Sequence, residues 1–405
     1  MKHEKIVNKT TSYGLNVSGG NIDSLRVKDD LKTVIRVYDD GKIGIAGRIG
    51  EGDDKALFED AKARLSQNIT YPCDLTAGKT RKENCVKNIV PATDFVKTMK
   101  KLLARLNKEY PDFIFSNKIN MEEYSSVYEN SENTRYEYAS NYLAIILVIQ
   151  HKKSASIMDL AYGAVQNYYD EDKVVSDIGK LLAPFDKKAE LDDTLPVIIG
   201  DSIIHYSLRH IIAELYMSGA SLFNGKLGEK LFDEKVNIYL DRGPDNKECI
   251  PFFDSEGVVN DGDKFYFIKD GVFNGLLTYK RTAHNFNLPL SGGGYSDFDE
   301  VPVAAAVGIK LGATSDSLKK LIKGKAIYIV EAGGGDMTPD GTLGIPVQLA
   351  YLYDNGELVG KLPEFSLNAN IFDLLGKDLI GVAKNDVFGF MEDTVLAAKF
   401  KINKN

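Results

Sequence analysis

The segment Thr33–Ala46 reads TVIRVYDDGKIGIA and decides the first part of the fold. Its two halves, Thr33–Tyr38 and Lys42–Ala46, are rich in β-branched residues and are joined by Asp-Asp-Gly. An Asp-Gly pair between such runs is the strongest short-range signal of a β-hairpin. A second turn signal, Gly19-Gly20-Asn21, lies upstream. The region from Tyr13 to Gly50 is therefore predicted to form an antiparallel meander.

Helices and further strands are predicted after this meander. The segments Asp54–Gln67 and Thr93–Asn107 carry apolar residues at helical spacing, the second behind a threonine cap, so each is predicted to be a helix. Strands are predicted around Tyr110–Asn117 and Arg135–Gln150. A third helix is predicted from Ser156 to about Leu182.

The character of the chain changes at Pro184–Pro196, which is charged and rich in helix breakers. We place a domain boundary there, between residues 1–185 and residues 190–405. The second part is predicted to contain helices at Asp201–Ser218 and Ser315–Lys323 among many short strands. Because strands and helices do not alternate regularly, the fold class is α+β, with an N-terminal antiparallel sheet with helices and a β-rich C-terminal domain.

Composition excludes several classes of protein. The chain has 405 residues, of which 43% are hydrophobic and 27% are charged, as in ordinary globular proteins. The formal net charge is −8, and residues 1–190 carry +1 while residues 191–405 carry −9. An acidic half repels a phosphate backbone, and there is no basic stripe with interleaved aromatic residues. Direct binding to nucleic acid is therefore not expected.

Cysteine usage and hydropathy predict a cytoplasmic protein. The three cysteines, Cys73, Cys85 and Cys249, form no C-x-x-C pair, so neither a disulfide framework nor a zinc ribbon is indicated. A reduced compartment fits this pattern. The N-terminus does not read as a secretory signal. The longest apolar run, Tyr142–Ile149, has eight residues, whereas a membrane helix needs about 20. We expect no membrane association.

The predicted helix at 201–218 contains two histidines that could bind a metal. Its apolar stripe consists of Ile204, Leu208, Ile211 and Leu215. On a regular helix His205 lies about 140° from His210, whereas Glu214 lies beside His210. Zinc protease helices place two histidines on one face with a glutamate directly after the first. A packed helix with flanking histidines is therefore the favoured interpretation, and an atypical metal site formed by His205, His210 and Glu214 is the alternative.

Other motifs give weaker signals. The segment Asp254-Ser255-Glu256-Gly257 places two carboxylates on one strand face, so acid/base chemistry is conceivable, but a turn with the glycine at positive φ is favoured. The runs Gly292–Gly294 and Gly333–Gly335 lack the residues that follow in phosphate loops and are better explained as flexible loops beside a groove. Ser221 and Ser291 lack a nucleophile elbow.

Several longer segments resemble the TldD/PmbA (TldE) family. They are Val34–Gly44, Ser218–Lys230, Phe253–Val258, Ile268–Leu277, Glu364–Leu375 and Val382–Asp386. Each motif alone is loose. Because together they follow the family's order over nearly the full length, the resemblance is specific.

The resemblance implies a role in a two-subunit peptidase, in a family once described as modulators of DNA gyrase. TldD-type subunits hold zinc on an H-E-x-x-x-H helix with a distant cysteine, and PmbA/TldE-type subunits lack it. Alignment on Ser218-Gly219 places His210 at the first ligand, Ile211 at the glutamate and Leu215 at the second histidine. The stretch Val387–Asp393, where the cysteine would lie, contains none. No catalytic residue and no metal site are therefore predicted in this chain.

The resemblance thus predicts a PmbA/TldE-like subunit with no cofactor of its own. Zinc is expected in a TldD-type partner, and the substrate is expected to be a peptide or an unfolded chain. A homodimer is expected when the partner is absent. Two alternatives stay open: an autonomous metallopeptidase using His210 and Glu214 with a remote residue such as His205 or His284, and a homodimeric scaffold of the gyrase-modulator type.

Overall fold

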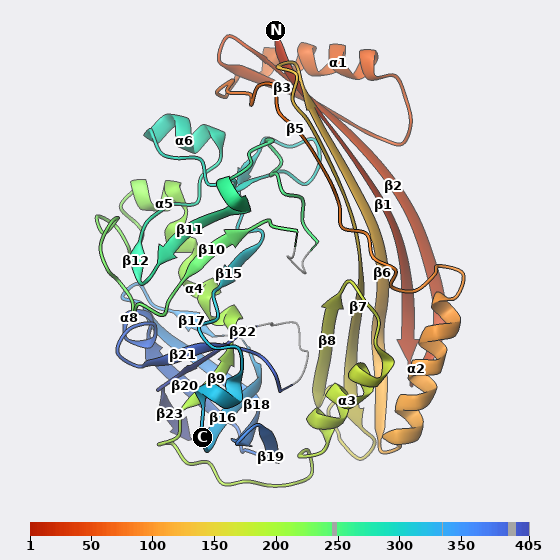
Figure 1. The fold of residues 1–405 in the computed structure, drawn as a ribbon, viewed down its shortest axis with the longest axis vertical. Helices are drawn as coiled ribbons and strands as arrows, with labels where there is room; N and C mark the ends of the chain where they lie inside the picture. Colours follow the sequence, from red (N-terminus) through yellow and green to blue (C-terminus); the bar gives the residue numbers. More distant parts are fainter. Residues whose placement is uncertain (245–248, 334, 388–393, 405) are drawn as a thin grey trace.

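The protein combines one long curved sheet with a strand-rich C-terminal half. A computed structural model describes residues 1–244, 249–333, 335–387 and 394–404. The long sheet lies on one side of the molecule and curves around the C-terminal half, which carries the other sheets (Figure 1). The predicted α+β class is confirmed.

The elements of the first half form around an eight-stranded sheet of order β4-β3-β2-β1-β6-β7-β5, with β8 also paired to β7. Their bounds are β1 Lys2–Ser18, β2 Asn21–Asp39, β3 Lys42–Ile49, α1 Asp54–Ala63, η1 Arg64–Gln67, β4 Ile69–Thr70, β5 Thr80–Asn84, α2 Phe95–Glu109, β6 Phe113–Asn130, β7 Arg135–His151, β8 Leu160–Gln166 and α3 Glu171–Leu182. The meander and the first two helices are as predicted. The strand expected around 110–117 is much longer than predicted, because β6 pairs with β7 along its whole length.

The helix predicted from Ser156 to Leu182 is wrong in its first half. Residues Leu160–Gln166 form β8, whose alternate residues are buried against the sheet, so their period is two and not 3.6. Helix α3 begins only after Asp170, whose side chain accepts a hydrogen bond from the backbone N–H of Lys173. This N-cap fixes the start of the helix.

The second half contains two larger sheets, of order β21-β22-β9-β16-β18-β20-β23 and β12-β11-β10-β15. Its elements are β9 Val197–Gly200, η2 Asp201–Ile204, α4 His205–Leu208, η3 Arg209–Ile211, α5 Ala213–Met217, β10 Ile238–Asp241, η4 Asp261–Asp263, β11 Lys264–Lys269, β12 Val272–Phe273, α6 Lys280–Phe286, β13 Gly294–Tyr295, β14 Val303–Ala304, β15 Ile309–Leu311, α7 Leu318–Leu321, β16 Lys325–Ala332, β17 Asp336–Met337, β18 Thr342–Asp354, β19 Glu357–Lys361, β20 Phe365–Asn370, α8 Ile371–Leu374, β21 Leu379–Lys384, β22 Thr394–Ala398 and β23 Lys401–Lys404. The helix predicted at 315–323 shrinks to α7, and the sequence analysis missed α6 and α8.

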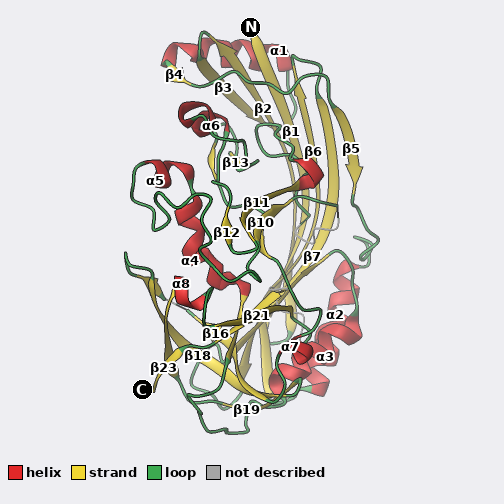
Figure 2. Cartoon of the chain, turned by 60° about the vertical axis from the view of Figure 1, so that its left-hand side comes forward, coloured by secondary structure: helices red, strands yellow, loops and turns green. Residues whose placement is uncertain are grey.

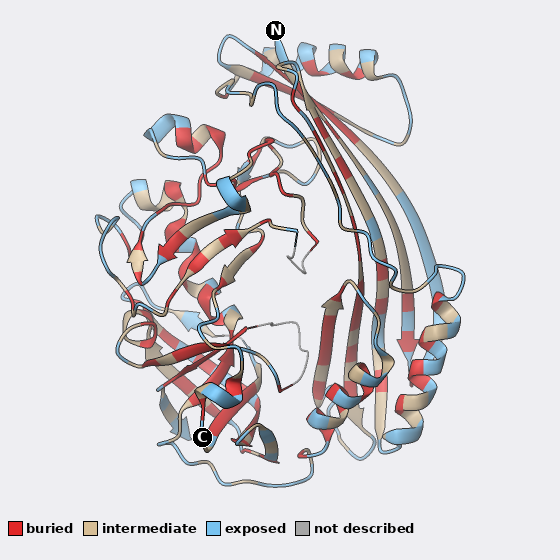
Figure 3. Ribbon diagram, viewed as in Figure 1, coloured by how far each residue is buried: buried red, intermediate tan, exposed pale blue. Residues whose placement is uncertain are grey.

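Among the described residues, two regions of contact join the halves. At one end, Ile178 of α3 and Tyr351 of β18 belong to one apolar core, and the Tyr351 hydroxyl donates to the carbonyl of Leu181 at 2.9 Å. Figure 2 shows this end, where α2 and α3 lie side by side. The central strands of the C-terminal sheet are largely buried there (Figure 3). Because this core crosses the expected boundary, the division at 185–190 stays a prediction.

The other contact uses the opposite face of the long sheet. Side chains alternate along a strand, so Glu4, Ile6 and Asn8 of β1 share one face with Tyr128 and Ser126 of β6. This face meets the C-terminal half. None of the helices in the described ranges is long and apolar enough to cross a membrane.

Substitution Met99→Ala tests how far the sheet depends on α2. Met99 is fully buried between this helix and the sheet. Its truncation should leave a cavity and lower the free energy of unfolding by about 2–5 kcal/mol, measured by urea denaturation. The control substitution Lys100→Ala, at the neighbouring exposed residue, should change the free energy of unfolding by less than about 0.5 kcal/mol. Equal effects of the two variants would contradict the assigned face of α2.

Candidate functional site

The segment that resembles the family's zinc helix is not one continuous helix. It consists of η2, α4, η3 and α5, and it breaks at Ile212, whose backbone is extended with ψ 126°. The break lets the chain pair with Leu277, whose N–H donates to Ile211 at 2.7 Å and whose carbonyl accepts from Ala213 at 3.1 Å. The helix predicted at 201–218 is therefore wrong, because tertiary pairing overrides the helical pattern.

His210 is buried and has a structural role at this break. Its Nδ1 accepts a hydrogen bond from the N–H of Leu222 at 3.1 Å, and the Ser221 hydroxyl donates to its carbonyl at 2.7 Å. The ring packs edge-on against Phe223. Burial, with the nearby charge of Arg209, lowers the pKa of His210. A neutral imidazole has one acceptor nitrogen, and here Nδ1 is that acceptor, so Nε2 carries the proton.

The other two residues of the atypical site lie elsewhere. His205 is exposed and lines a cleft beside α4. Glu214 lies against Tyr279, and hydrogen bonding to that carboxylate is one of the influences that raise the Tyr279 pKa, although burial is the largest. His284 is exposed on α6. Within the described ranges, no group of three or more His, Cys, Asp or Glu side chains could hold a metal ion.

The residues at the aligned zinc positions do not fit a zinc ion. Ile211 is buried and Leu215 is half-buried, and neither has a donor atom. Zinc in proteins takes three or four N, S or O ligands. Residues 388–393, most of the stretch in which a cysteine ligand was sought, lie outside the described residues.

The cleft lined by His205 has a volume of about 630 Å³. One wall is α4 with Arg209, and the other is the end of β16 from Ile329 onward, together with Gly333 and β17. Strand β9 pairs with β16 only at Ile327 and Tyr328. Among the described residues, no strand continues this pairing beyond Tyr328, so the edge of β16 opens into the cleft. Of the predicted loop Gly333–Gly335, Gly333 lines this cleft, and residue 334 lies outside the described residues.

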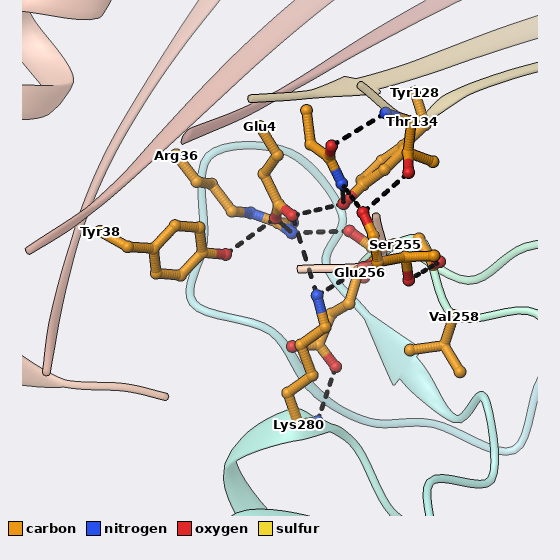
Figure 4. Close-up of polar contacts among 12 residues, drawn as sticks. Glu4, Arg36, Tyr38, Tyr128, Thr134, Ser255, Glu256, Val258 and Lys280 are labelled. Atoms are coloured by element: carbon orange, nitrogen blue, oxygen red, sulfur yellow. Dashed lines mark hydrogen bonds and ion pairs between the residues drawn. The ribbon is translucent and has the colours of Figure 1, made fainter. Parts of the chain in front are cut away.

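A second polar site, which the sequence analysis did not predict, is a buried charge cluster between the two halves (Figure 4). Glu4 of β1 and Arg36 of β2 are fully buried and are joined by a hydrogen bond of 2.8 Å from Arg36 Nη1 to Glu4 Oε1. Arg36 also donates to the carbonyl of Ser255 and to the hydroxyl of Ser296, each at 2.6 Å. This guanidinium thus binds both halves of the protein.

Glu4 is held ionised by its neighbours. Burial acts to raise its pKa, but the positive charges of Lys280 and Arg36, with hydrogen bonds from Arg36 and Tyr128, outweigh burial and lower the pKa. The hydroxyls of Tyr38 and Tyr128 donate to its two oxygens at 2.9 and 2.8 Å. A fully buried carboxylate with this many donors is stable as an anion.

On the C-terminal side, the pKa of Glu256 is raised, whereas that of Glu4 is lowered. Burial and then the charge of Asp254 raise the pKa of Glu256 to about 7. Its oxygens accept from the Tyr71 hydroxyl at 2.5 Å and from the backbone N–H of Lys280 at 2.8 Å. The ammonium group of Lys280 donates to the Glu256 carbonyl at 2.8 Å. Burial also raises the pKa of Asp254.

The two acidic residues sit in the turn that the sequence predicted. Asp254 accepts from the N–H groups of Glu256 and Val258, each at 2.9 Å, and Gly257 has φ +69°. The turn is confirmed. A side chain at Gly294 would lie 2.6 Å from Glu256 Oε2 and 2.7 Å from Asp254 Oδ2, so the two carboxylates share one small space.

The sequence held a partial signal for this cluster. Asp254 and Glu256 were noted as a conceivable acid/base pair, with a turn as the favoured interpretation. Glu4 and Arg36 face each other because β1 and β2 pair in the register Glu4↔Arg36, which the sequence alone does not fix. The arginine at the centre of the apolar run Thr33–Tyr38 is a signal from which a buried ion pair could have been predicted, but the sequence analysis did not use it.

The fold and these sites define a two-part α+β protein with one long curved sheet and a strand-rich C-terminal half. Residues 195–403 match the model of the "PmbA/TldA metallopeptidase C-terminal domain". The chain therefore belongs to the PmbA/TldD family, as the resemblance predicted.

Individual relatives agree with this assignment. A metalloprotease of Archaeoglobus fulgidus is 26% identical over 54% of this chain and 51% of its own length, so the chain spans about half of that relative. A zinc metalloprotease TldD homolog of Saccharolobus solfataricus is 21% identical over 69% of this chain and 66% of its own length. The structure of TldE from Thermococcus kodakarensis has a TM-score of 0.82 at 17% identity, covering 100% of this chain and 97% of that one. That likeness shows the fold alone.

Substitution Arg36→Met tests the buried ion pair. It leaves the Glu4 carboxylate without its main partner in a site shielded from water, so the free energy of unfolding should fall by about 3–5 kcal/mol, measured by urea denaturation. The double variant Glu4→Leu/Arg36→Met removes both charges and should recover part of the loss. The single variant Glu4→Leu completes the comparison. If the double variant loses as much free energy of unfolding as the two single variants lose in sum, the pairing is contradicted.

Substitution Glu256→Gln tests the raised pKa. The folded-state pKa of about 7 lies above the ordinary 4.5, so the stabilisation from this group's proton is present below pH 4.5 and is lost as the pH rises through about 7. Gln cannot ionise. Relative to wild type, the variant should gain on the order of 1–3 kcal/mol of unfolding free energy between pH 5 and pH 8, measured by urea denaturation at each pH. The control substitution Glu229→Gln, at an exposed residue, should show no such gain. Equal changes in the two variants would contradict the raised pKa of Glu256.

Proposed function

We propose that this protein is a PmbA/TldE-like subunit of a TldD/TldE-type metallopeptidase complex and does not itself hold the catalytic zinc. The observation that carries the proposal is the state of His210. It is the one aligned ligand position that keeps a donor side chain, and its acceptor nitrogen is bound by the Leu222 N–H. A single imidazole does not hold Zn²⁺ against water.

The general base is missing as well. In zinc peptidases a carboxylate next to the metal activates the bound water. The aligned position is Ile211, which is buried and apolar. Glu214 does not replace it, because its carboxylate lies at Tyr279. The zinc and the hydrolytic chemistry are therefore assigned to a TldD-type partner, in line with the zinc metalloprotease name of the Saccharolobus relative.

The cleft beside α4 is the proposed place for the substrate, an extended peptide or an unfolded chain. The open edge of β16 presents backbone N–H and C=O groups, which pair with any extended chain and give affinity with little sequence preference. His205 and Arg209 are exposed on the facing wall and could bind carbonyl or carboxylate groups of the peptide. A homodimer is the proposed state in the absence of the partner, since isologous pairs are the commonest closed assemblies.

Purification with and without a TldD-type chain from the same source tests the proposal. We expect the two chains to co-elute, zinc to follow the partner, and this chain to raise the partner's peptidase activity. Substitution His210→Ala in this chain, with folding checked by circular dichroism, should leave the zinc content of the complex unchanged. Replacing the first histidine of the partner's motif is the matched control, and this replacement should remove the zinc from the complex.

The opposite pattern would favour the autonomous metallopeptidase. In that case the isolated chain would bind stoichiometric zinc, lose it on His210→Ala and cleave peptides alone. Failure of the two chains to associate at micromolar concentration would reject the subunit role.

A further inference from the structure

Two of the three cysteines come together from opposite halves of the protein. Cys85 directly follows β5 at the edge of the long sheet, and Cys249 precedes the Asp254 turn of the C-terminal half. Both are thiols in the structure. Cys73, the third, packs elsewhere, beside the cluster that contains Tyr71.

Strand β7 positions both thiols. Strand β5 runs parallel to β7 in the register Asn84↔Ala139, and the N–H of Cys85 donates to the Ala139 carbonyl at 2.8 Å. The next pair in this register is Cys85 beside Ser140. Paired residues of neighbouring strands point to the same face of a sheet. The Cys85 side chain is therefore on the face of Ser140, which meets the C-terminal half.

Cys249 lies against the same residues of β7. The Ser140 hydroxyl donates to the Cys249 carbonyl at 3.1 Å, and the Cys249 thiol donates to the Asn141 carbonyl, with its sulfur at 3.5 Å. Three consecutive residues of β7 thus contact one or the other cysteine.

Tyr138, which precedes Ala139 on β7, interacts with both thiols. Burial raises its pKa, and interactions with Cys85 and Cys249 add to the rise, one of them a hydrogen bond with Cys85. The Cys249 pKa is raised by burial and then by the charge of Cys85. Cys85 also packs against the apolar cluster that contains Tyr138.

We propose that Cys85 and Cys249 form a reversible disulfide that joins the long sheet to the C-terminal half when the protein meets a disulfide oxidant such as oxidised glutathione. The Cys85 thiolate attacks one glutathione sulfur and displaces glutathione thiolate. The Cys249 thiolate then attacks the sulfur of Cys85 and displaces the second glutathione. Two protein thiols are oxidised to one disulfide, and oxidised glutathione is reduced to two thiols, which take up the two protons released.

The difference in exposure between the two cysteines determines which thiol reacts first. Cys85 is partly accessible, whereas Cys249 is 9% exposed. The bulky oxidant reaches Cys85 first, and the buried thiol resolves the mixed disulfide from within the protein. The bond would close a loop of more than 150 residues and restrain the polar contact between the halves.

Oxidation of the full-length protein tests the proposal. After incubation with oxidised glutathione at pH 8.5, the thiols titrated under denaturing conditions should fall from three to one, and peptide mapping should recover a Cys85–Cys249 link. The melting temperature should rise and return to its starting value with dithiothreitol. Cys73→Ser should fall from two thiols to none and show the same rise.

The single variants separate the proposal from simple glutathionylation. In Cys249→Ser, Cys85 should retain glutathione and the melting temperature should not rise. In Cys85→Ser, the buried Cys249 should remain a thiol. A wild-type protein that keeps glutathione on Cys85, keeps all three thiols, or forms a disulfide through Cys73 would overturn the proposal.

Discussion

The ion pair between Glu4 and Arg36 is the constraint on which the arrangement of the molecule depends. Both side chains are fully buried, and a buried charge without a partner costs several kcal/mol. The pair forms only if β1 and β2 keep their register, since a shift of one residue between the strands would place the two side chains on opposite faces of the sheet. It is complete only if the Ser255 carbonyl of the C-terminal half reaches Arg36. One interaction therefore links strand register to the placement of the two halves.

The two contacts between the halves differ in kind, and the difference has a structural consequence. The core around Tyr351 and Ile178 is apolar, and apolar burial is strong but not directional. The charge cluster is directional, because each donor must meet its acceptor at hydrogen-bond distance. The close approach at Gly294, where no side chain fits beside Asp254 and Glu256, adds a steric condition. The apolar contact holds the halves together, and the polar contact sets their relative orientation.

The sequence predicted those features that depend on local patterns. Asp40-Gly41 gave the hairpin, helical spacing gave α1 and α2, and Gly257 gave a turn with positive φ. The errors arose where distant residues decide the local structure. Residues 160–166 become a strand because β7 offers an edge, and the 201–218 helix breaks because Leu277 pairs with Ile211. The charge cluster could not be assembled in advance, since residues from its two sides, such as Arg36 and Ser255, lie more than 200 residues apart and meet only through strand register and the placement of the halves.

His210 is part of the local structure of the segment that carries it. A zinc ligand must offer a lone pair outward, whereas His210 uses its Nδ1 lone pair inward, on the Leu222 N–H that shapes the following loop. The loop is fastened a second time by the Ser221 hydroxyl on the His210 carbonyl. These two hydrogen bonds hold the loop against the segment that carries His210. Once the segment is stabilised in this way, the neighbouring positions need only pack, and apolar residues such as Ile211 do so without the cost of burying a polar group.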